Sequence, residues 1–144
     1  MKIKNPFSKS NILILVPVIL VMLLDGVFTL AGQPAQYWQN YHLFNEASPL
    51  GQVLMLHPAY FVVFFVFYIL FVMFLAANLK RPFNIIVALG FFLGHAWGSS
   101  TWVSTIFYKL TGVYAVNDWC LVVGYFIIIA VISGFCINKW AKTT

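Results

Sequence analysis

The sequence predicts an all-α membrane protein with four transmembrane helices in an antiparallel bundle. Hydrophobic residues make up 62% of the 144 residues and charged residues 8%, whereas an average soluble domain has roughly 25% charged residues. This number of charged residues is too small to give a folded domain a polar exterior. Hydrocarbon must therefore surround most of the surface. Four apolar stretches are each long enough to cross the bilayer core of roughly 30 Å, which needs about 20 helical residues.

The four predicted spans belong to a single domain, residues 1–144. In chain order they cover about residues 12–32, 53–79, 85–108 and 119–138. The first is longer than the apolar region of a cleaved signal peptide and contains Pro17 and Asp25, so we expect it to be retained. The segment KRPF joins the second and third spans and predicts a helical hairpin, because proline favours a tight turn. The outer loop, residues 33–52, is rich in Gln, Asn, Tyr and Trp and predicts an interfacial lid or short helix.

Lysine and arginine residues predict the orientation of the chain. All eight basic residues except Lys109 fall in the N-terminal arm, the second connection or the C-terminal tail. Positive residues concentrate in cytoplasmic segments, so we expect both termini on the cytoplasmic side of a cell (inner) membrane. This topology and attraction to anionic headgroups account for the net charge of +5. No nucleic-acid partner is predicted.

Polar residues of three predicted spans come to similar depths. Measured inward from the predicted outer helix ends at 1.5 Å per residue, Asp25, His57 and Ser99 lie about 9–10 Å deep, and His95 lies about 15 Å deep. Thr105 is taken here as the outer end of the third span. Ionisable groups at the bilayer centre cost roughly 2.5–3.5 kcal/mol on insertion scales and turn toward a cavity or a partner. The shared level therefore predicts a polar pocket that opens outward.

Metal binding is the preferred chemistry for this predicted pocket. Asp25, His57 and His95, with Glu46 folded down from the outer loop, would supply imidazole and carboxylate ligands for a divalent transition metal such as zinc. A purely structural alternative is also open. In that case Asp25 accepts hydrogen bonds from a neighbouring helix, His57 lies at a helix start, and the serines bond to their own backbone carbonyls.

Three further alternatives belong to different functional classes. Ser99 or Ser100 could be a nucleophile with His57 as its base and Asp25 as the orienting acid, which would give an intramembrane hydrolase or acyltransferase. His57 and His95 could be the axial ligands of a b-type haem. The chain could also be a noncatalytic accessory or assembly subunit that docks on a larger membrane complex.

Three glycines repeat at four-residue spacing in the third predicted span: Gly90, Gly94 and Gly98. Small residues at this spacing line one helix face and allow another helix to approach closely. The stripe predicts close packing within the bundle. A homodimer or membrane-protein interface, or space for a flat cofactor, is the alternative.

Two short segments, LLDGVFT and NEASPL, resemble DUF5658-type small bacterial and archaeal membrane proteins. In that family an aspartate and a nearby threonine of the first helix pair with a Glu-x-Asn-Pro-like segment that opens the second. Asp25 and Thr29 match the first part and Glu46 and Pro49 match the second, whereas Ser48 stands where the family often has asparagine. The resemblance implies a compact helical membrane domain with Asp25 and Glu46 in one site. It implies no activity.

Overall fold

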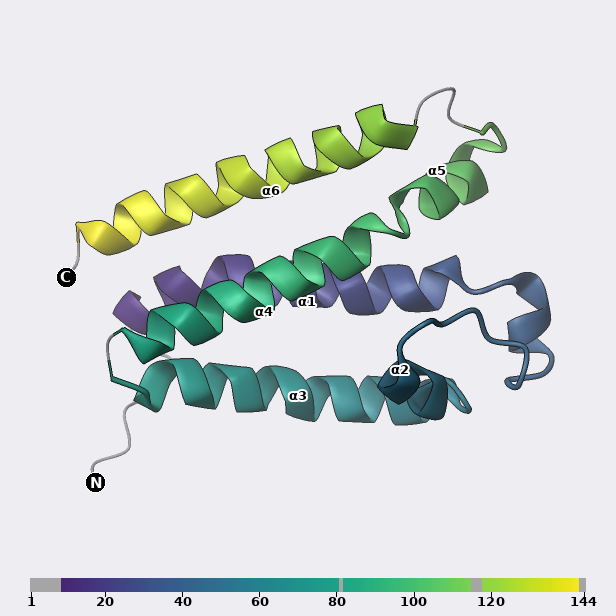
Figure 1. The fold of residues 1–144 in the computed structure, drawn as a ribbon, viewed down its shortest axis with the longest axis horizontal. Coiled ribbons are helices and arrows are strands. Elements are labelled where there is room, and N and C mark those ends of the chain that lie inside the picture. The colour runs from purple at the N-terminus through teal and green to yellow at the C-terminus, as the bar shows by residue number, and fades with distance from the viewer. Residues whose placement is uncertain (1–8, 81, 115–117, 143–144) are drawn as a thin grey trace.

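All regular secondary structure in the described part of the chain is helical (Figure 1). The computed structural model describes residues 9–80, 82–114 and 118–142, so the basic residues Lys2, Lys4 and Arg81 lie outside the described residues. The elements are α1 (Lys9–Gly32), η1 (Ala35–Trp38), α2 (Pro49–Leu54), α3 (Pro58–Asn78), α4 (Phe83–Ser100), α5 (Val103–Thr111) and α6 (Asp118–Ala141). Among these, α1, α3, α4 and α6 are long and apolar enough to cross a membrane. The predicted fold class is confirmed.

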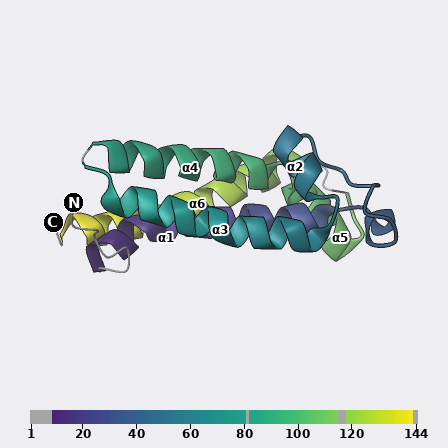
Figure 2. The ribbon, with the colours of Figure 1, turned by 90° about the horizontal axis from the view of Figure 1, so that it is seen from below.

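Helix α1 is the centre of the bundle. It packs against α3, α4 and α6, and most extensively against α4. Figures 1 and 2 show α1 and α4 running in the same direction, while α3 and α6 run back the other way. Because α1 and α4 are parallel neighbours, residues at equal distances from their ends come side by side.

The outer surface of the bundle is apolar. Large hydrophobic side chains on α3 and α6, such as Phe67, Phe71 and Phe135, are exposed. The buried core is small and includes Met22 and Val72, which belong to one cluster between α1, α3 and α4. A chain with this distribution of side chains is stable only where hydrocarbon covers its outer face. It is a multi-pass membrane protein in contact with lipid.

The third span ends earlier than the sequence predicts. Helix α4 stops at Ser100, and the chain turns at Thr101 and Trp102 before α5 begins. The Trp102 ring packs on Gly32, where a Cβ atom would collide with it. This contact fixes the outer ends of α1 and α4 against each other. The predicted single helix over residues 85–108 is therefore two helices.

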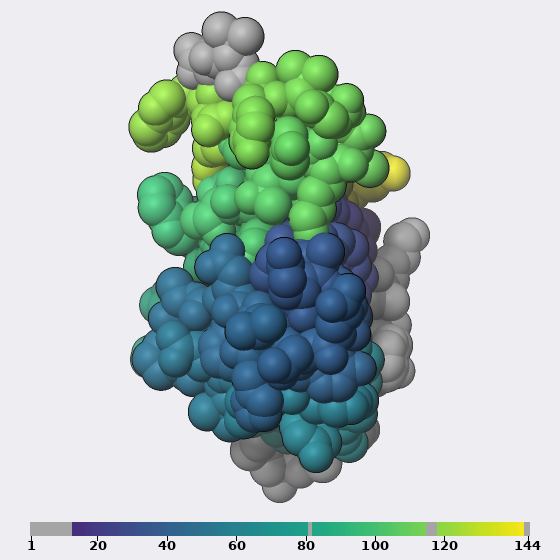
Figure 3. Space-filling view, turned by 90° about the vertical axis from the view of Figure 1, so that its right-hand side faces the viewer, coloured from purple at the N-terminus to yellow at the C-terminus, as the bar shows by residue number. Residues whose placement is uncertain are grey.

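The segment after α1 is held down by the side chain of Gln33, which is fully buried. Its amide nitrogen donates to the carbonyls of Thr29 at 2.9 Å and Asn45 at 3.1 Å, and its amide oxygen accepts from the Asn45 N–H at 2.7 Å. Lys109 of α5 donates to the carbonyls of Ala31 and Gln33. A cation at the carbonyl end of a helix also complements its dipole. Figure 3 shows this end of the bundle, where residues 33–57 in blue lie beside α5 in green.

Replacing Gln33 with methionine should release the loop it holds. Methionine has a similar length but cannot bond to the backbone of Thr29 and Asn45. Thr29 is buried, and a buried backbone group left unpaired costs about 1–3 kcal/mol. We expect a loss of this size in the free energy of unfolding and faster amide hydrogen exchange across residues 40–48. Gln36→Met, at an exposed position of η1, is the matched control. Unchanged exchange in Gln33→Met would show that the loop is held by other contacts.

Candidate functional site

An aspartate and a histidine from neighbouring helices form a pair within the bundle. His95 Nδ1 of α4 lies 2.7 Å from Asp25 Oδ2 of α1. The two side chains are 15% and 19% exposed, respectively, so most of their surface is removed from the surroundings. Such a short contact orients the imidazole, because Nδ1 is occupied by the carboxylate and only Nε2 is left for other partners.

The Nε2 atom of His95 faces helix α3. The Tyr68 hydroxyl of α3 lies 3.4 Å from Nε2. The imidazole also contacts the rings of Phe65 and Phe91, with ring centroids 6.3 and 6.4 Å apart. Three helices thus meet at one cluster of polar atoms, Asp25, Tyr68 and His95, which we call the polar cluster.

The carboxylate of Asp25 fits into the bundle because residue 98 is glycine. A Cβ atom on Gly98 would lie 2.8 Å from Asp25 Oδ1 and 3.0 Å from Oδ2. By contrast, a Cβ atom on Gly90 or Gly94 would meet nothing within 4 Å among the described residues. The glycine stripe is therefore used for close packing at Gly98 alone, and the expected packing at Gly90 and Gly94 does not occur within the described bundle.

A cavity of about 330 Å³ lies between the polar cluster and the loop that follows α1. Asp25, Thr29, Glu46 and His95 contribute polar atoms to its wall. Its aromatic wall consists of Phe61, Phe64, Phe65, Tyr68 and Trp102. We call it the end cavity, since it lies at the end of the bundle that carries α2 and α5.

A second hollow, of about 460 Å³, lies on the other side of the same cluster. Asp25, Tyr68 and His95 line it together with Val87, Gly90, Phe91 and Gly94. Gly90 and Gly94 are exposed on the outer face of α4, so this hollow is a groove open to the side of the bundle. We call it the lateral groove.

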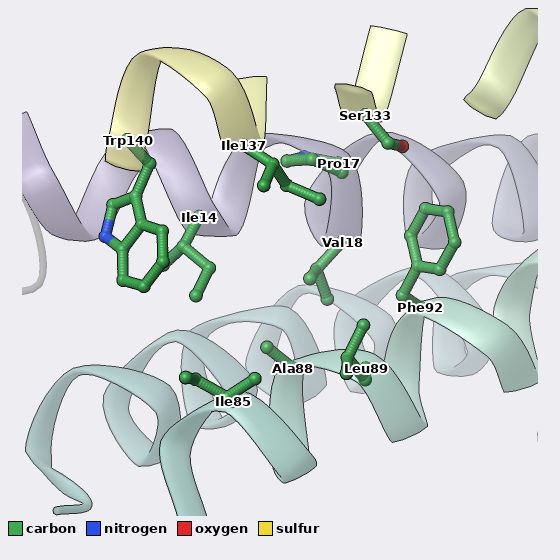
Figure 4. A pocket seen from close by; sticks show the side chains of 10 residues that line it. All are labelled: Ile14, Pro17, Val18, Ile85, Ala88, Leu89, Phe92, Ser133, Ile137 and Trp140. Atoms are coloured by element: carbon green, nitrogen blue, oxygen red, sulfur yellow. The ribbon is translucent and has the colours of Figure 1, made fainter. Parts of the chain in front are cut away.

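A third cavity is unrelated to this chemistry. It lies between α1, α4 and α6, has a volume of about 210 Å³, and is lined by apolar side chains such as Val18 and Phe92 (Figure 4). Its one hydroxyl group, on Ser133, is bonded to the Ile129 carbonyl at 2.7 Å. Without a titratable or free polar group, this cavity offers packing space only.

The structure does not bring His57 to the polar cluster. Helix α2 ends at Leu54 and α3 begins at Pro58, so His57 is the N-cap of α3, and its Nδ1 accepts from the Ala59 N–H at 3.2 Å. Its ring contacts Tyr41 and Tyr60. Tyr68 lies eleven residues further along α3, which is about 16 Å. The predicted depth of His57 was counted along a continuous helix from Gly51, and the structure breaks that helix between Leu54 and Pro58.

The hydroxyl groups of the two candidate nucleophiles bond to carbonyls and to a tyrosine rather than to a histidine side chain. The Ser99 hydroxyl donates to the His95 carbonyl at 2.6 Å and bonds to the Tyr125 hydroxyl on α6. The Ser100 hydroxyl donates to the Trp97 carbonyl at 2.7 Å. Neither serine lines the end cavity or the lateral groove. These bonds match the structural alternative for the serines rather than the triad.

The four predicted metal ligands are not assembled around one point. Within the part of the chain that the structure describes, no group of three or more His, Cys, Asp or Glu side chains could hold a metal ion. Asp25 and His95 are in contact. Glu46 belongs to a different part of the end-cavity wall, where its carboxylate accepts from the Ser48 N–H at 2.8 Å. His57 and His95 contact different rings, so they do not face each other as axial haem ligands.

Two residues, one in the polar cluster and one that holds the loop after α1, carry little signal in the sequence. Tyr68 lies within the phenylalanine-rich stretch of α3, where the sequence pattern predicts that one more aromatic ring contributes only to packing. Gln33 reads as a loop residue, although it is fully buried. For Tyr68 the available signal was its hydroxyl, since a phenol buried in hydrocarbon usually finds a hydrogen-bond partner.

Fold and site together define a small multi-pass membrane protein with a polar cluster where three of its spanning helices meet. Comparison of the chain with protein-family models, curated proteins and solved structures gives no match.

Proposed function

We propose that the end cavity is a binding site for a small organic cation. The observation that carries this proposal is the make-up of its wall, which combines two carboxylates and one imidazole with five aromatic rings. No lysine or arginine is among the described residues that line it. Asp25, Thr29 and Glu46, three of the residues that match DUF5658-type proteins, all line this cavity, in keeping with one shared site.

The charge of the end cavity favours a cation whichever state His95 adopts. With a neutral imidazole the two carboxylates give two negative charges, and with a protonated imidazole one negative charge is left. A cation within about 6 Å of an aromatic ring also gains roughly 0.5–2 kcal/mol from the ring quadrupole, most where water is excluded. Quaternary ammonium groups suit such a site because they need no hydrogen-bond acceptor.

Calorimetric titration of the protein in lipid nanodiscs with tetramethylammonium tests this proposal. We expect saturable binding that Asp25→Asn and Glu46→Gln each weaken at least tenfold, equivalent to about 1.4 kcal/mol. Asp118→Asn is the matched control, because Asp118 is the third acidic residue and lies exposed at the start of α6. Binding that responds equally to all three substitutions, or no binding by wild-type protein, would refute the cation site.

We also propose that the end cavity faces away from the cytoplasm in a cell (inner) membrane. Support comes from the basic residues, all of which except Lys109 belong to the opposite end of the bundle by sequence. Lys109 is bonded to the carbonyls of Ala31 and Gln33, and it is one basic residue against seven at the other end. A cysteine introduced at Lys80 in a Cys120→Ala/Cys136→Ala background should react only after cells are permeabilised. Labelling of intact cells would reverse the orientation.

Zinc binding is a second candidate because Asp25, Glu46 and His95 line one cavity. Glu46 would have to give up its bond to the Ser48 N–H and turn toward the cluster to become a third ligand. Elemental analysis of protein purified without chelators should then give one zinc per chain, lost in His95→Ala and kept in His57→Ala. Metal-free, folded wild-type protein would exclude this candidate.

A further inference from the structure

The end cavity and the lateral groove share the three residues of the polar cluster, Asp25, Tyr68 and His95. They therefore meet at one point, and a ligand that reaches the cluster can extend into both. Along the chain the end cavity extends from His95 on α4 to Trp102 at the start of α5, and the lateral groove extends from His95 back to Val87. The two hollows follow each other along the axis of the bundle.

The lateral groove is placed where a hydrocarbon chain would lie. Eight residues separate Val87 from His95, a distance of about 12 Å along a helix. Apart from the polar cluster, the side chains that line the groove are those of Val87 and Phe91, and Gly90 and Gly94 leave its floor free of side chains. Since these glycines are exposed on the outer face of α4, the groove is open to bilayer hydrocarbon.

We infer that the ligand is a lipophilic cation, an amphiphile with a positively charged headgroup and a single alkyl chain, which enters from the bilayer. The inference rests on the cation site proposed above and assigns the headgroup to the end cavity and the chain to the lateral groove. This order matches an amphiphile in the leaflet nearest the end cavity, whose head lies at the surface and whose chain points to the bilayer centre. A zwitterionic phospholipid fits less well, because no lysine or arginine among the described lining residues would pair with its phosphate.

The test compares dodecyltrimethylammonium with tetramethylammonium on the same protein in nanodiscs, with the concentration of the alkyl probe counted per lipid. Gly90→Leu fills the groove without touching the end cavity, since a side chain there starts in open space. We expect Gly90→Leu to lower the affinity for dodecyltrimethylammonium at least fivefold and to change the affinity for tetramethylammonium less than twofold. Gly134→Leu on α6, which is also exposed and open, is the matched control.

The outcomes separate this inference from the cation site itself. If Gly90→Leu leaves both affinities unchanged while Asp25→Asn still weakens tetramethylammonium, the cation site stands and the lateral groove is not used. If tetramethylammonium does not bind at the cavity, the cation site fails first. A photoreactive diazirine at the end of the alkyl chain adds a readout on wild-type protein. Crosslinks within residues 87–94 support the inference, and crosslinks spread evenly over the outward faces of α3 and α6 overturn it.

Discussion

Replacing Gly98 with alanine is expected to destabilise the protein by about 1–3 kcal/mol, the usual cost of an added methyl group in a packed site. The new Cβ atom would lie 2.8 Å from Asp25 Oδ1. To avoid this overlap, the carboxylate must rotate away from His95 or α1 must move from α4. Either response lengthens the contact of 2.7 Å between Asp25 and His95. We therefore also expect tetramethylammonium binding to weaken.

The same substitution at two neighbouring glycines provides a sharp control. Gly90 and Gly94 lie on the same helix, and alanine there meets nothing within 4 Å in the described structure. Alanine has a higher helix propensity than glycine by roughly 0.8–1 kcal/mol. Gly90→Ala and Gly94→Ala should thus be neutral or slightly stabilising. Unfolding by sodium dodecyl sulfate in mixed micelles measures all three variants. Equal effects at positions 90, 94 and 98 would mean that Gly98 is not needed for the approach of Asp25.

The contact between Asp25 and His95 shows how much of the site can be predicted by counting residues along the helices. Gly32 contacts Trp102, and Asp25 contacts His95. Asp25 precedes Gly32 by seven residues and His95 precedes Trp102 by seven residues, so the two contacts are spaced equally along the two parallel segments. For this pair the count along the helices was offset because Thr105 was taken as the outer end of the third span, whereas the count for His57 failed at the break before α3. The choice of Thr105 placed His95 about one turn too deep.

The break before α3 is harder to predict. Residues 53–56 are Val, Leu, Met and Leu, which continue the hydrophobic run of the second span without a polar interruption. Only the HP dipeptide marks the boundary, because a residue before proline avoids the helical conformation. Met55 is fully buried in the cluster with Tyr37 and Phe61, so packing of the outer loop decides where α3 begins. Such packing is a tertiary effect that hydropathy does not encode.

A double-mutant cycle on Asp25 and His95 should reveal a coupling of about 1–1.7 kcal/mol. Removing one member of a buried pair leaves the other without its partner, at a cost of about 1–3 kcal/mol. Asp25→Leu and His95→Phe remove the charge and the nitrogens while keeping side-chain volume. The double variant should be less destabilised than the two single effects added together, since neither polar group is left alone.

The expected size of this coupling follows from the membrane environment. Breaking a buried ion pair in a soluble protein typically costs about 3–5 kcal/mol. In membrane proteins, polar groups of the unfolded state also find partners, and measured couplings average about 0.6 kcal/mol with a maximum near 1.7. The short contact and the low exposure of both side chains place Asp25 and His95 at the upper end of that range. The cycle of Asp25→Leu with Ser133→Ala is the control, because Ser133 is bonded within α6. Strict additivity for Asp25 and His95 would mean that their contact contributes no net stability, and the polar cluster would then be held together by aromatic packing around the imidazole.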